Sequence, residues 1–444
     1  MEMNTIGSFL NRVKDSVEIQ DDIEYKRVTI KTNHQGVKLR NKALGSTIGT
    51  KKQFKIKGGD FILSKIDARY GAFGIIPEDL DGAIITGNFW TYEVNTDMVD
   101  IEWFFYFTHS FDFMQICKES STGTTHRKYL NEKIFLGHKI YLPNKSVQSE
   151  MVKKYKEASI KGNILDSEIQ TQKQLISQLK QAILQEAIQG KLTQEWREQN
   201  PNTEPASKLL ERIKAEKEQL IKDKKIRKEK PLPPITEDEI PFDIPESWSW
   251  CRLGSVSLYL NGKGFESSDF QKNKGIKCIK ITNAGVGEVI PTDDTLPLNF
   301  KEKYSAYLVY ENDIVIALTR PYIADGLKVS LCPKEYNESL LNQRVAVIKG
   351  LFVKNKYIYK YLRTNFVLKG YKDEFDSKGQ QPNLKTEHIT NLLFPLPPFE
   401  EQKAIVEKVE TLMQKCNALE EEITQSEEHA NMLMQSVLKE AFEG

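Results

Sequence analysis

The strongest constraint on the fold is a pair of long heptad-repeat stretches whose ends are nearly alike. Residues 181–190, QAILQEAIQG, recur 254 positions later as residues 435–444, QSVLKEAFEG. Upstream of each copy, two interleaved series of mostly apolar residues repeat every seven positions, which is the a/d pattern of a coiled coil. We therefore predict two long helices that pair along a seam formed by Leu165, Ile169, Gln172, Ile176, Leu179, Ile183, Leu412, Leu419, Ile423, Ser426, Leu433 and Val437.

One of the two series is interrupted by a polar residue once in each copy, at Gln172 and at Ser426. A polar residue at a single seam position helps to fix register, so the matched interruption favours two helices built for each other. Two unrelated amphipathic surface helices are the alternative. The matched heptad phase and the matched ends count against it.

The globular segments that precede the two helices also repeat. Gly59–Ser64 (GDFILS) matches Asn312–Ala317 (NDIVIA), and Asn88–Val94 aligns with Asn342–Ile348. β-Branched and aromatic runs broken by glycine turns predict strands mixed with helices. We therefore predict an α/β (α+β) tandem duplication with pseudo-two-fold organisation, in which two similar domains are separated by a long antiparallel pair of helices.

The predicted segments follow from these repeats and from a change in composition between them. Residues 206–230 are rich in interleaved Lys and Glu, typical of a solvated helix, and five prolines between positions 231 and 245 predict an extended linker. The predicted boundaries are 1–145 for the first domain, 146–199 for the first spacer helix, 200–247 for the charged helix and linker, 248–397 for the second domain and 398–444 for the second spacer helix.

The near-zero net charge of +1 hides an uneven distribution. Residues 248–397 carry 21 Lys+Arg against 15 Asp+Glu, whereas residues 398–444 carry 4 against 11. A mildly basic domain suits contact with a phosphate backbone, and an acidic helix does not. Five scattered cysteines, no leader-like N-terminus and no apolar run of about 20 residues lead us to expect a cytoplasmic protein without membrane contact.

Catalytic patterns are missing from the sequence. The phosphate-loop spacing is absent, the six histidines show no metal-ligand spacing, and Gly262-Lys263-Gly264 lacks the third glycine of a dinucleotide turn. No pair of carboxylates with a following lysine indicates a nuclease. We therefore predict no catalytic residue, no metal and no cofactor bound by this chain.

Binding features are easier to find, because cations and amides cluster in glycine-containing loops at matching places in the two domains. Lys and Arg position a protein on phosphates, and Arg, Asn and Gln can pair with base edges. The candidate DNA-contacting residues of the first domain are Lys38, Arg40, Lys42, Lys51, Lys52, Lys65, Arg69, Thr124, Thr125, His126, Arg127 and Lys128. Those of the second domain are Lys263, Lys274, Lys277, Lys280, Thr282, Asn283, Arg320, Tyr322, Arg344, Lys378, Gln380, Gln381 and Asn383.

In their order and duplication, several of these stretches resemble the specificity subunit of Type I restriction–modification systems. The stretches are IPFDIPESWSWCRLG at 240–254, GDFILSKIDAR at 59–69, and PLPPFEEQK at 395–403 followed by the long heptad helix. The Pro/Trp-rich start occurs only before the second domain, so we expect either that the first domain begins differently or that its start is trimmed.

The resemblance implies two recognition domains that each read one half of a split DNA site. It also implies helices of about 65 Å, at 1.5 Å per residue, that act as spacer and as docking surface for two methyltransferase subunits. Those partners would supply S-adenosylmethionine chemistry on adenine, and motor-nuclease (restriction) subunits would join for cleavage. Two alternatives remain: a coiled-coil scaffold that binds protein, and a fused methyltransferase or nuclease.

Overall fold

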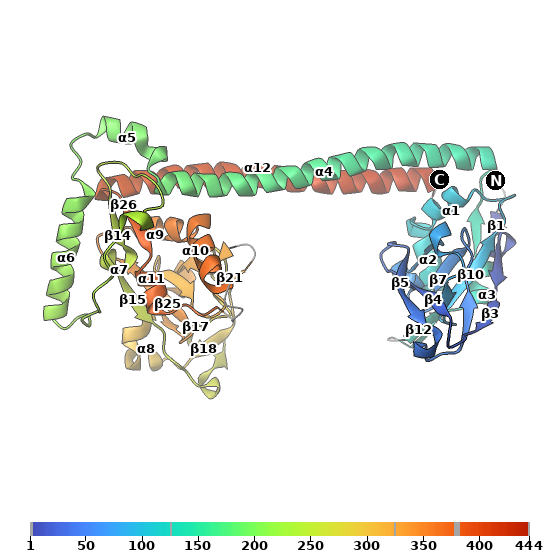
Figure 1. The fold of residues 1–444 in the computed structure, drawn as a ribbon, viewed down its shortest axis with the longest axis horizontal. Helices are drawn as coiled ribbons and strands as arrows, with labels where there is room; N and C mark the ends of the chain where they lie inside the picture. The colour runs from blue at the N-terminus through green and yellow to red at the C-terminus, as the bar shows by residue number, and fades with distance from the viewer. Residues whose placement is uncertain (1–2, 125–126, 324–325, 377–381, 443–444) are drawn as a thin grey trace. The chain divides into compact units, whose positions relative to one another are not determined.

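The computed structural model describes residues 3–124, 127–323, 326–376 and 382–442 (Figure 1). The chain divides into two compact units. The first contains residues 1–171 and 423–444, and the second contains residues 172–422. Each unit consists of one globular domain with half of each long helix, so each is described by itself.

The first domain contains a main sheet and a second sheet. The main sheet has the order β2-β10-β7-β8, formed by β2 (Leu10–Val13), β10 (Phe89–Val94), β7 (Phe61–Ser64) and β8 (Phe73–Ile75). The second has the order β3-β6-β9-β4-β5, formed by β3 (Asp15–Glu18), β6 (Lys52–Lys55), β9 (Ile84–Ile85), β4 (Glu24–Ile30) and β5 (Val37–Leu44). The remaining elements are the pair β1 (Met3–Thr5) and β13 (Lys139–Tyr141), the hairpin β11 (Ser121–Thr124) and β12 (Arg127–Leu130), and the helices α1 (Ile101–Phe107), α2 (Phe111–Glu119) and α3 (Glu132–Gly137).

The second domain repeats this plan. Its main sheet has the order β15-β25-β20-β23, formed by β15 (Ser257–Asn261), β25 (Val345–Gly350), β20 (Ile314–Ala317) and β23 (Val329–Leu331). The second sheet runs β16-β18-β17-β24-β19, formed by β16 (Gln271–Lys272), β18 (Asp294–Leu296), β17 (Ile276–Ile279), β24 (Ser339–Leu341) and β19 (Leu308–Val309). The other elements are the pairs β14 (Ser249–Arg252) with β26 (Leu393–Leu396) and β21 (Tyr322–Ile323) with β22 (Gly326–Leu327), and the helices α7 (Leu253–Val256), α8 (Phe300–Lys303), α9 (Asn355–Leu362), α10 (Asn365–Phe375) and α11 (Thr386–Thr390).

The main sheets of the two domains share strand order and register. Phe89 lies opposite Ser64 in the first domain, and Val345 lies opposite Ala317 in the second. The predicted tandem duplication is therefore present in the fold, with one correction to the alignment. Asn88 precedes β10 as Arg344 precedes β25, so the sequence alignment of Asn88 with Asn342 was wrong by two residues.

The cores form on the central strands, because their side chains are apolar on both faces. Phe61, Leu63 and Tyr92 pack with aromatic residues of α1 and α2 in the first domain. Val315 and Val347 occupy the equivalent sheet in the second domain, where aliphatic residues dominate. Strands that are apolar on both faces need cover on each side, which the helices and the second sheet supply.

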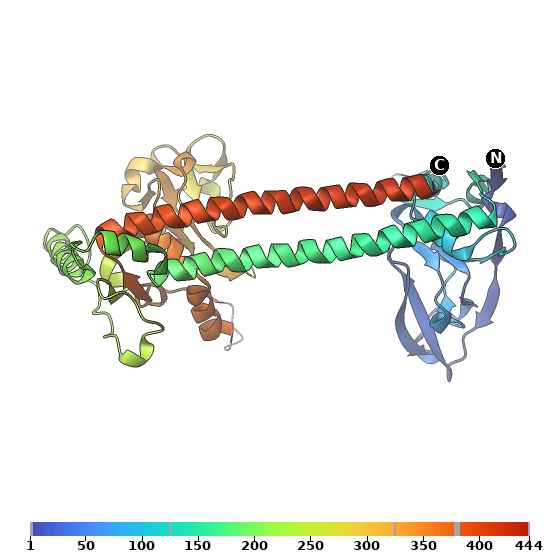
Figure 2. The same cartoon turned by 90° about the horizontal axis from the view of Figure 1, so that it is seen from above.

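Two long helices, α4 (Lys145–Ile188) and α12 (Phe399–Phe442), lie side by side and antiparallel (Figure 2). In the first unit, a Cβ atom on Gly162 would lie 2.8 Å from Sδ of Met434, so the small residue permits close approach. In the second unit, Nζ of Lys180 lies 2.7 Å from Oε2 of Glu420. The predicted coiled-coil pair is confirmed in both units.

One of the two predicted heptad series forms the seam, and the other does not. Ile169, Ile176, Ile183 and Ile423 are 2–8% exposed, but Leu165, Leu179, Leu419 and Leu433 are 40–62% exposed. Gln172 and Ser426, which belong to the same series as these four leucines, are exposed as well. Leu412 and Val437 are half-buried. The prediction was too broad because two helices cover only a narrow stripe on each other, and burying a second series requires a further partner.

A buried glutamine joins each globular domain to its long helix in the same way. Gln148 on α4 accepts a hydrogen bond from the backbone N–H of Asp100 (2.6 Å) and donates to the carbonyls of Met98 and Pro143. Gln402 on α12 accepts from the N–H of Lys354 (2.9 Å) and donates to the Pro397 carbonyl. The duplication therefore includes the joint between domain and helix.

The segment between α4 and the second domain is more ordered than predicted. Helix α4 ends at Ile188, short of the predicted 199, because Gly190 adopts the left-handed conformation (φ 74°) that ends helices. A 3-10 turn (Lys191–Thr193), α5 (Gln194–Gln199) and α6 (Ala206–Lys222) follow, and α6 buries Leu209 and Ile213. Among the described residues, no helix is long and apolar enough to cross a membrane.

The proline-rich linker is fixed to the second domain rather than free. The guanidinium of Arg252 donates to the carbonyls of Pro233 (3.2 Å) and Pro234 (2.9 Å) and pairs with Glu239 at 2.9 Å. Because proline lacks an N–H, its carbonyl is the only backbone group available for such an anchor. The hydrogen bond from the backbone N–H of Thr236, followed by the hydrogen bonds and charge of Arg252, holds the pKa of the Glu239 carboxyl below its usual value.

Candidate nucleic-acid interface

Three loops of the second domain meet at one end of its inner strands, where β20 ends and β25 begins. After β20, the N–H of Leu318 donates to the carbonyl of Arg344 (3.0 Å), and the Leu318 carbonyl accepts from the N–H of Leu384 (2.7 Å). Thr319 and Asn383 form an isolated β-bridge beside this junction. The junction therefore brings together three loops that are far apart in sequence and contain the predicted site residues Arg320, Arg344 and Asn383.

The first domain contains the same junction. The N–H of Lys65 donates to the carbonyl of Asn88 (3.0 Å), and the Lys65 carbonyl accepts from the N–H of Leu130 (2.7 Å). Lys65, Asn88 and Leu130 occupy the places of Leu318, Arg344 and Leu384. The matched loops predicted from the sequence therefore converge in both domains on equivalent backbone hydrogen bonds.

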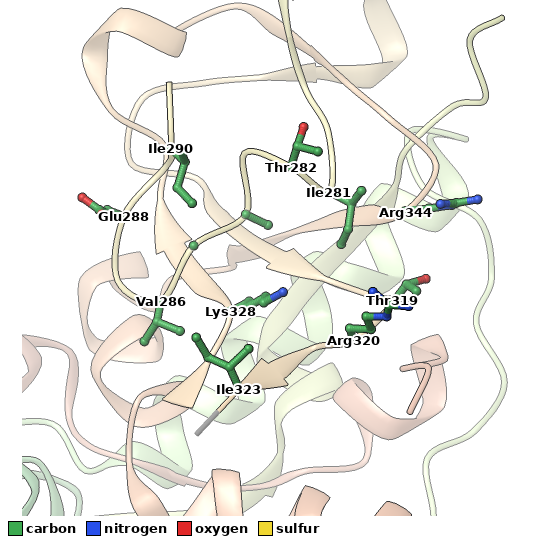
Figure 3. A pocket seen from close by; sticks show the side chains of 12 residues that line it. Ile281, Thr282, Val286, Glu288, Ile290, Thr319, Arg320, Ile323, Lys328 and Arg344 are labelled. Carbon is green, nitrogen blue, oxygen red and sulfur yellow. The ribbon is translucent and has the colours of Figure 1, made fainter. Parts of the chain in front are cut away.

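Beside the junction in the second domain lies a hollow of about 960 Å³ (Figure 3). Three cationic side chains line it: those of Arg320, Lys328 and Arg344, the last extending from one rim. Thr282 and Thr319 add hydroxyl groups, and apolar side chains such as Ile281 form part of the wall. An open, cation-lined hollow of this kind suits a phosphate backbone together with the edges of bases.

Among the described residues, the positive charge of the hollow is largely uncompensated. Glu288 is the one carboxylate that lines it within the described ranges, and none of the three cations forms an ion pair there. Arg320 also has a left-handed backbone (φ 49°), which non-glycine residues adopt rarely. Concentrated positive charge on a constrained loop is typical of a binding site for anions.

Three of the residues predicted to contact DNA have partners within the second domain. Asn283 is buried, and its amide donates to the Ile290 carbonyl and to the hydroxyls of Thr292 and Tyr336. Lys280 pairs with Asp294, whose carboxyl pKa it lowers, and Tyr322 donates to Asp376 (2.7 Å). In the chain without DNA, the side chains of Asn283, Lys280 and Tyr322 all have partners within the domain, and their contact with DNA stays a prediction.

The other lysines predicted in this domain differ in surroundings. Lys263 lies 5.0 Å from the ring centre of Tyr304 and Lys277 lies 4.5 Å from that of Tyr336, as in cation–π contacts. Lys274 is exposed. Lys378, Gln380 and Gln381 lie outside the described residues.

In the first domain, a basic hairpin of β4 and β5 carries the exposed cations Lys38, Arg40 and Lys42. Lys42 lies directly opposite Lys26, and the register shifts at Arg27. Nζ of Lys26 donates to the carbonyl of Asp79 (2.8 Å), whereas Lys38, Arg40 and Lys42 are exposed on β5. The hairpin therefore suits a phosphate backbone, although lysines also protect the edge strand β5 from pairing with other chains.

The remaining first-domain candidates are mixed. Lys51 is engaged with Asp21 and with the Gly45 carbonyl, whereas Lys52 is exposed. The guanidinium of Arg69 lies 4.7 Å from the ring centre of Tyr70. Thr124 and Arg127 end the strands of the β11–β12 hairpin, which carries exposed Lys128, while Thr125 and His126 lie outside the described residues.

Sequence reasoning missed Lys328 and Asn88. Lys328 is isolated between apolar residues, so no local pattern identified it. Asn88 was missed because the sequence alignment paired it with Asn342 and not with Arg344.

Among the described residues, no group of three or more His, Cys, Asp or Glu side chains could hold a metal ion. His34 and His109 stack at 4.8 Å, and burial followed by the charge of His109 lowers the pKa of His34 to about 4. An imidazole with so low a pKa stays neutral at physiological pH and packs as an aromatic group.

Comparison with known proteins agrees with this arrangement. The family model described as the Type I restriction modification DNA specificity domain matches residues 6–181 and 245–428. The chain is 42% identical over 247 residues to the Type I restriction enzyme EcoAI specificity subunit of Escherichia coli, covering 55% of this chain and 41% of that protein. It is 31% identical over 276 residues to the EcoEI specificity subunit of the same organism, covering 60% and 45%. The matched part thus spans less than half the length of either relative.

Solved structures show the same fold along the whole chain. A chain from a study of complex assembly and conformational transition of the type I R-M system has a TM-score of 0.65 at 17% identity, covering 99% of this chain and 97% of that one. The HsdS subunit from Thermoanaerobacter tengcongensis has a TM-score of 0.55 at 18% identity, covering 100% and 96%. With two family domains in tandem, each followed by a long helix, this chain belongs to the family of Type I restriction–modification DNA specificity proteins.

Proposed function

We propose that this chain is the non-catalytic DNA-specificity subunit of a Type I restriction–modification complex. Each globular domain reads one half of a bipartite double-stranded site. The observation that carries this proposal is the loop junction built twice from the same backbone hydrogen bonds, with the cation-lined hollow beside its second copy. Equivalent loops on rigid sheets are suited to reading two half-sites.

The two long helices serve as the docking surface for methyltransferase subunits. Their exposed apolar side chains support this role, because Ile160, Ile164, Leu175 and Leu179 on α4 are 46–66% exposed. A stripe of large apolar groups on a helix pair normally has a partner. The partners, two methyltransferase subunits joined by motor-nuclease subunits, supply S-adenosylmethionine and the catalytic groups. All five cysteines are buried free thiols, which supports a reducing cytoplasmic location.

DNA binding by the full-length chain, with and without methyltransferase subunits, tests the first part of the proposal. We expect affinity for random duplex to fall steeply, roughly 10³-fold or more, between 50 and 200 mM salt, because phosphate contacts release counterions. Arg320→Ala should weaken binding at every salt concentration. Lys301→Ala is the matched control, since Lys301 pairs with Glu338 in the same domain and does not line the hollow.

Absence of salt-sensitive binding, even with the methyltransferase present, would refute the DNA proposal and favour the alternative of a coiled-coil scaffold that binds protein. Methyl transfer by the purified chain alone would instead favour the enzyme alternative.

Substitutions at neighbouring positions on α4 test whether its exposed apolar side chains bind methyltransferase subunits. The double variant Leu175→Asp/Leu179→Asp should keep the helix pair folded but reduce capture of methyltransferase subunits at least tenfold, because both side chains are exposed. Ile176→Asp should disrupt the pair itself, since Ile176 is 7% exposed in the seam. Ser177→Asp, on the exposed surface, is the control. Circular dichroism and pull-down distinguish the outcomes, and unimpaired capture by the double variant would contradict docking at this surface.

A further inference from the structure

We propose that the residue just before the last inner strand of each main sheet is a base-reading position, and that its side chain sets different purines for the two half-sites. Arg344, before β25, recognises guanine in the half-site of the second domain. Asn88, before β10, recognises adenine in the half-site of the first. This inference rests on the proposed DNA-specificity function and adds to it which bases are read and by which residues.

The two residues are structural equivalents. The carbonyl of Arg344 accepts the hydrogen bond from Leu318, and the carbonyl of Asn88 accepts the hydrogen bond from Lys65, each at 3.0 Å. The preceding turn is also the same, because the N–H of Val345 donates to the carbonyl of Asn342 as the N–H of Phe89 donates to that of Thr86. One backbone position therefore carries an arginine in one copy and an asparagine in the other.

The loop that carries Arg344 is braced on both sides. Besides the Leu318 contact, the N–H of Lys263 donates to the carbonyl of Leu341, and the N–H of Gln343 donates to the carbonyl of Lys263. A Cβ atom at Gly262 would lie 2.0 Å from the Asn342 carbonyl oxygen, so only glycine permits this approach. The glycines around Lys263 thus serve to hold the Arg344 loop in place, which a specific contact requires.

The side chains at the two positions remain available. Both Arg344 and Asn88 are exposed, and Arg344 lines the hollow with Arg320 and Lys328. Its guanidinium can donate to O6 and N7 of guanine, while an asparagine amide can pair with N6 and N7 of adenine. Both pairings are bidentate and select one base over the others.

Other cations near the junction fit phosphate contact better. The place of Arg320 is taken in the first domain by Asp67, whose N–H is held by the hydroxyl of Ser64 in its own loop. An arginine in one domain and an aspartate in the other cannot contact a base in the same way, so this position does not fit a shared base-reading role. The position of Arg344 and Asn88 alternates between two side chains that each pair with a purine edge.

Binding selection from a randomised duplex library, with the full-length chain and methyltransferase subunits, tests the assignment. The wild type should select an invariant guanine in one half-site and an invariant adenine in the other. Arg344→Asn should lower the discrimination for guanine by roughly tenfold to a hundredfold and leave the other half-site unchanged. Asn88→Arg should change the base preference at one adenine position of the first domain's half-site and leave the other half-site unchanged. Lys42→Ala is the control, because an exposed hairpin lysine should weaken binding to all sequences equally.

Three outcomes would overturn the assignment: a uniform loss of affinity in Arg344→Asn, which indicates a phosphate contact; unchanged base preferences in both variants; or altered preferences in both half-sites from one substitution. Each can occur while the wild type still binds DNA in a salt-sensitive manner, so the inference can fail while the proposed function stands. Loss of all DNA binding by the wild type would refute the proposed function itself.

Discussion

The two globular domains have the same strand order, the same loop junction and the same glutamine joint, yet they differ in charge at equivalent positions. Gln148 and Gln402 bind backbone groups and are retained in both copies. Next to them, Val147 in the first copy is replaced by Glu401 in the second. Groups that satisfy backbone hydrogen bonds are thus retained, whereas neighbouring side chains have changed with their surroundings.

Glu401 is fully buried and joins three segments of the second unit. Its carboxylate accepts from the hydroxyl of Thr193 (2.7 Å), from the guanidinium of Arg197 (2.6 Å) and from the indole N–H of Trp248 (2.8 Å). The segment after α4 and the start of the second domain are therefore fixed to the first turn of α12. Val147, at the equivalent place in the first unit, is 36% exposed.

Of the substitutions considered, those at Glu401 and Val147 should give the largest difference in stability between the two units. Glu401→Ala removes the fully buried carboxylate that accepts from the partly buried Arg197 and from the buried Thr193 and Trp248, so we expect the free energy of unfolding of the second unit to fall by about 3–5 kcal/mol. Val147→Ala should cost less than about 1 kcal/mol, because the side chain is partly exposed. Chemical denaturation monitored by hydrogen exchange separates the two units. Equal losses in both variants would show that the second copy does not depend on this cluster.

A second difference concerns the aspartate that precedes the central strand. In the second domain, Asp313 pairs with Lys349 at 2.9 Å and accepts from the N–H of Tyr310. In the first, Asp60 occupies the same place, but Glu93 stands where Lys349 would be. Burial, and then the charges of Glu93 and Asp81 against that of Lys57, raise the pKa of Asp60 to about 6.

The same substitution should therefore act in opposite directions in the two domains. Because the folded pKa of Asp60 is raised, its ionisation destabilises the first domain as pH rises from about 4 to above 6. Asp60→Asn should stabilise that domain by roughly 1–2 kcal/mol at pH 7, and the gain should disappear near pH 4. Asp313→Asn should instead destabilise the second domain by roughly 1–2 kcal/mol at pH 7, since it breaks a partly buried ion pair. Thermal unfolding at pH 4 and pH 7 checks both, and a stabilising effect of Asp313→Asn would contradict the comparison.

Much of the architecture could be read from local patterns. The heptad spacing around Ile176 and Ile423 predicted the paired helices, and the recurring GDFILS and NDIVIA segments predicted the duplicated strands β7 and β20. These signals survive in a sequence because seams and inner strands demand apolar residues at a fixed period. The loops carry no such period, which is why Asn88 was aligned with the wrong residue.

The sequence by itself determined the tandem plan, the helix pairing and the lack of catalytic motifs, because each depends on residue type and spacing along the chain. Only the tertiary structure decided which cations remain available. Arg320, Lys328 and Arg344 come together through the folding of distant loops, while Lys280 and Asn283, equally promising in the sequence, are engaged by Asp294, Ile290 and Tyr336. The tertiary structure likewise decided which heptad series is covered, since a helix has two apolar flanks and a single partner buries one.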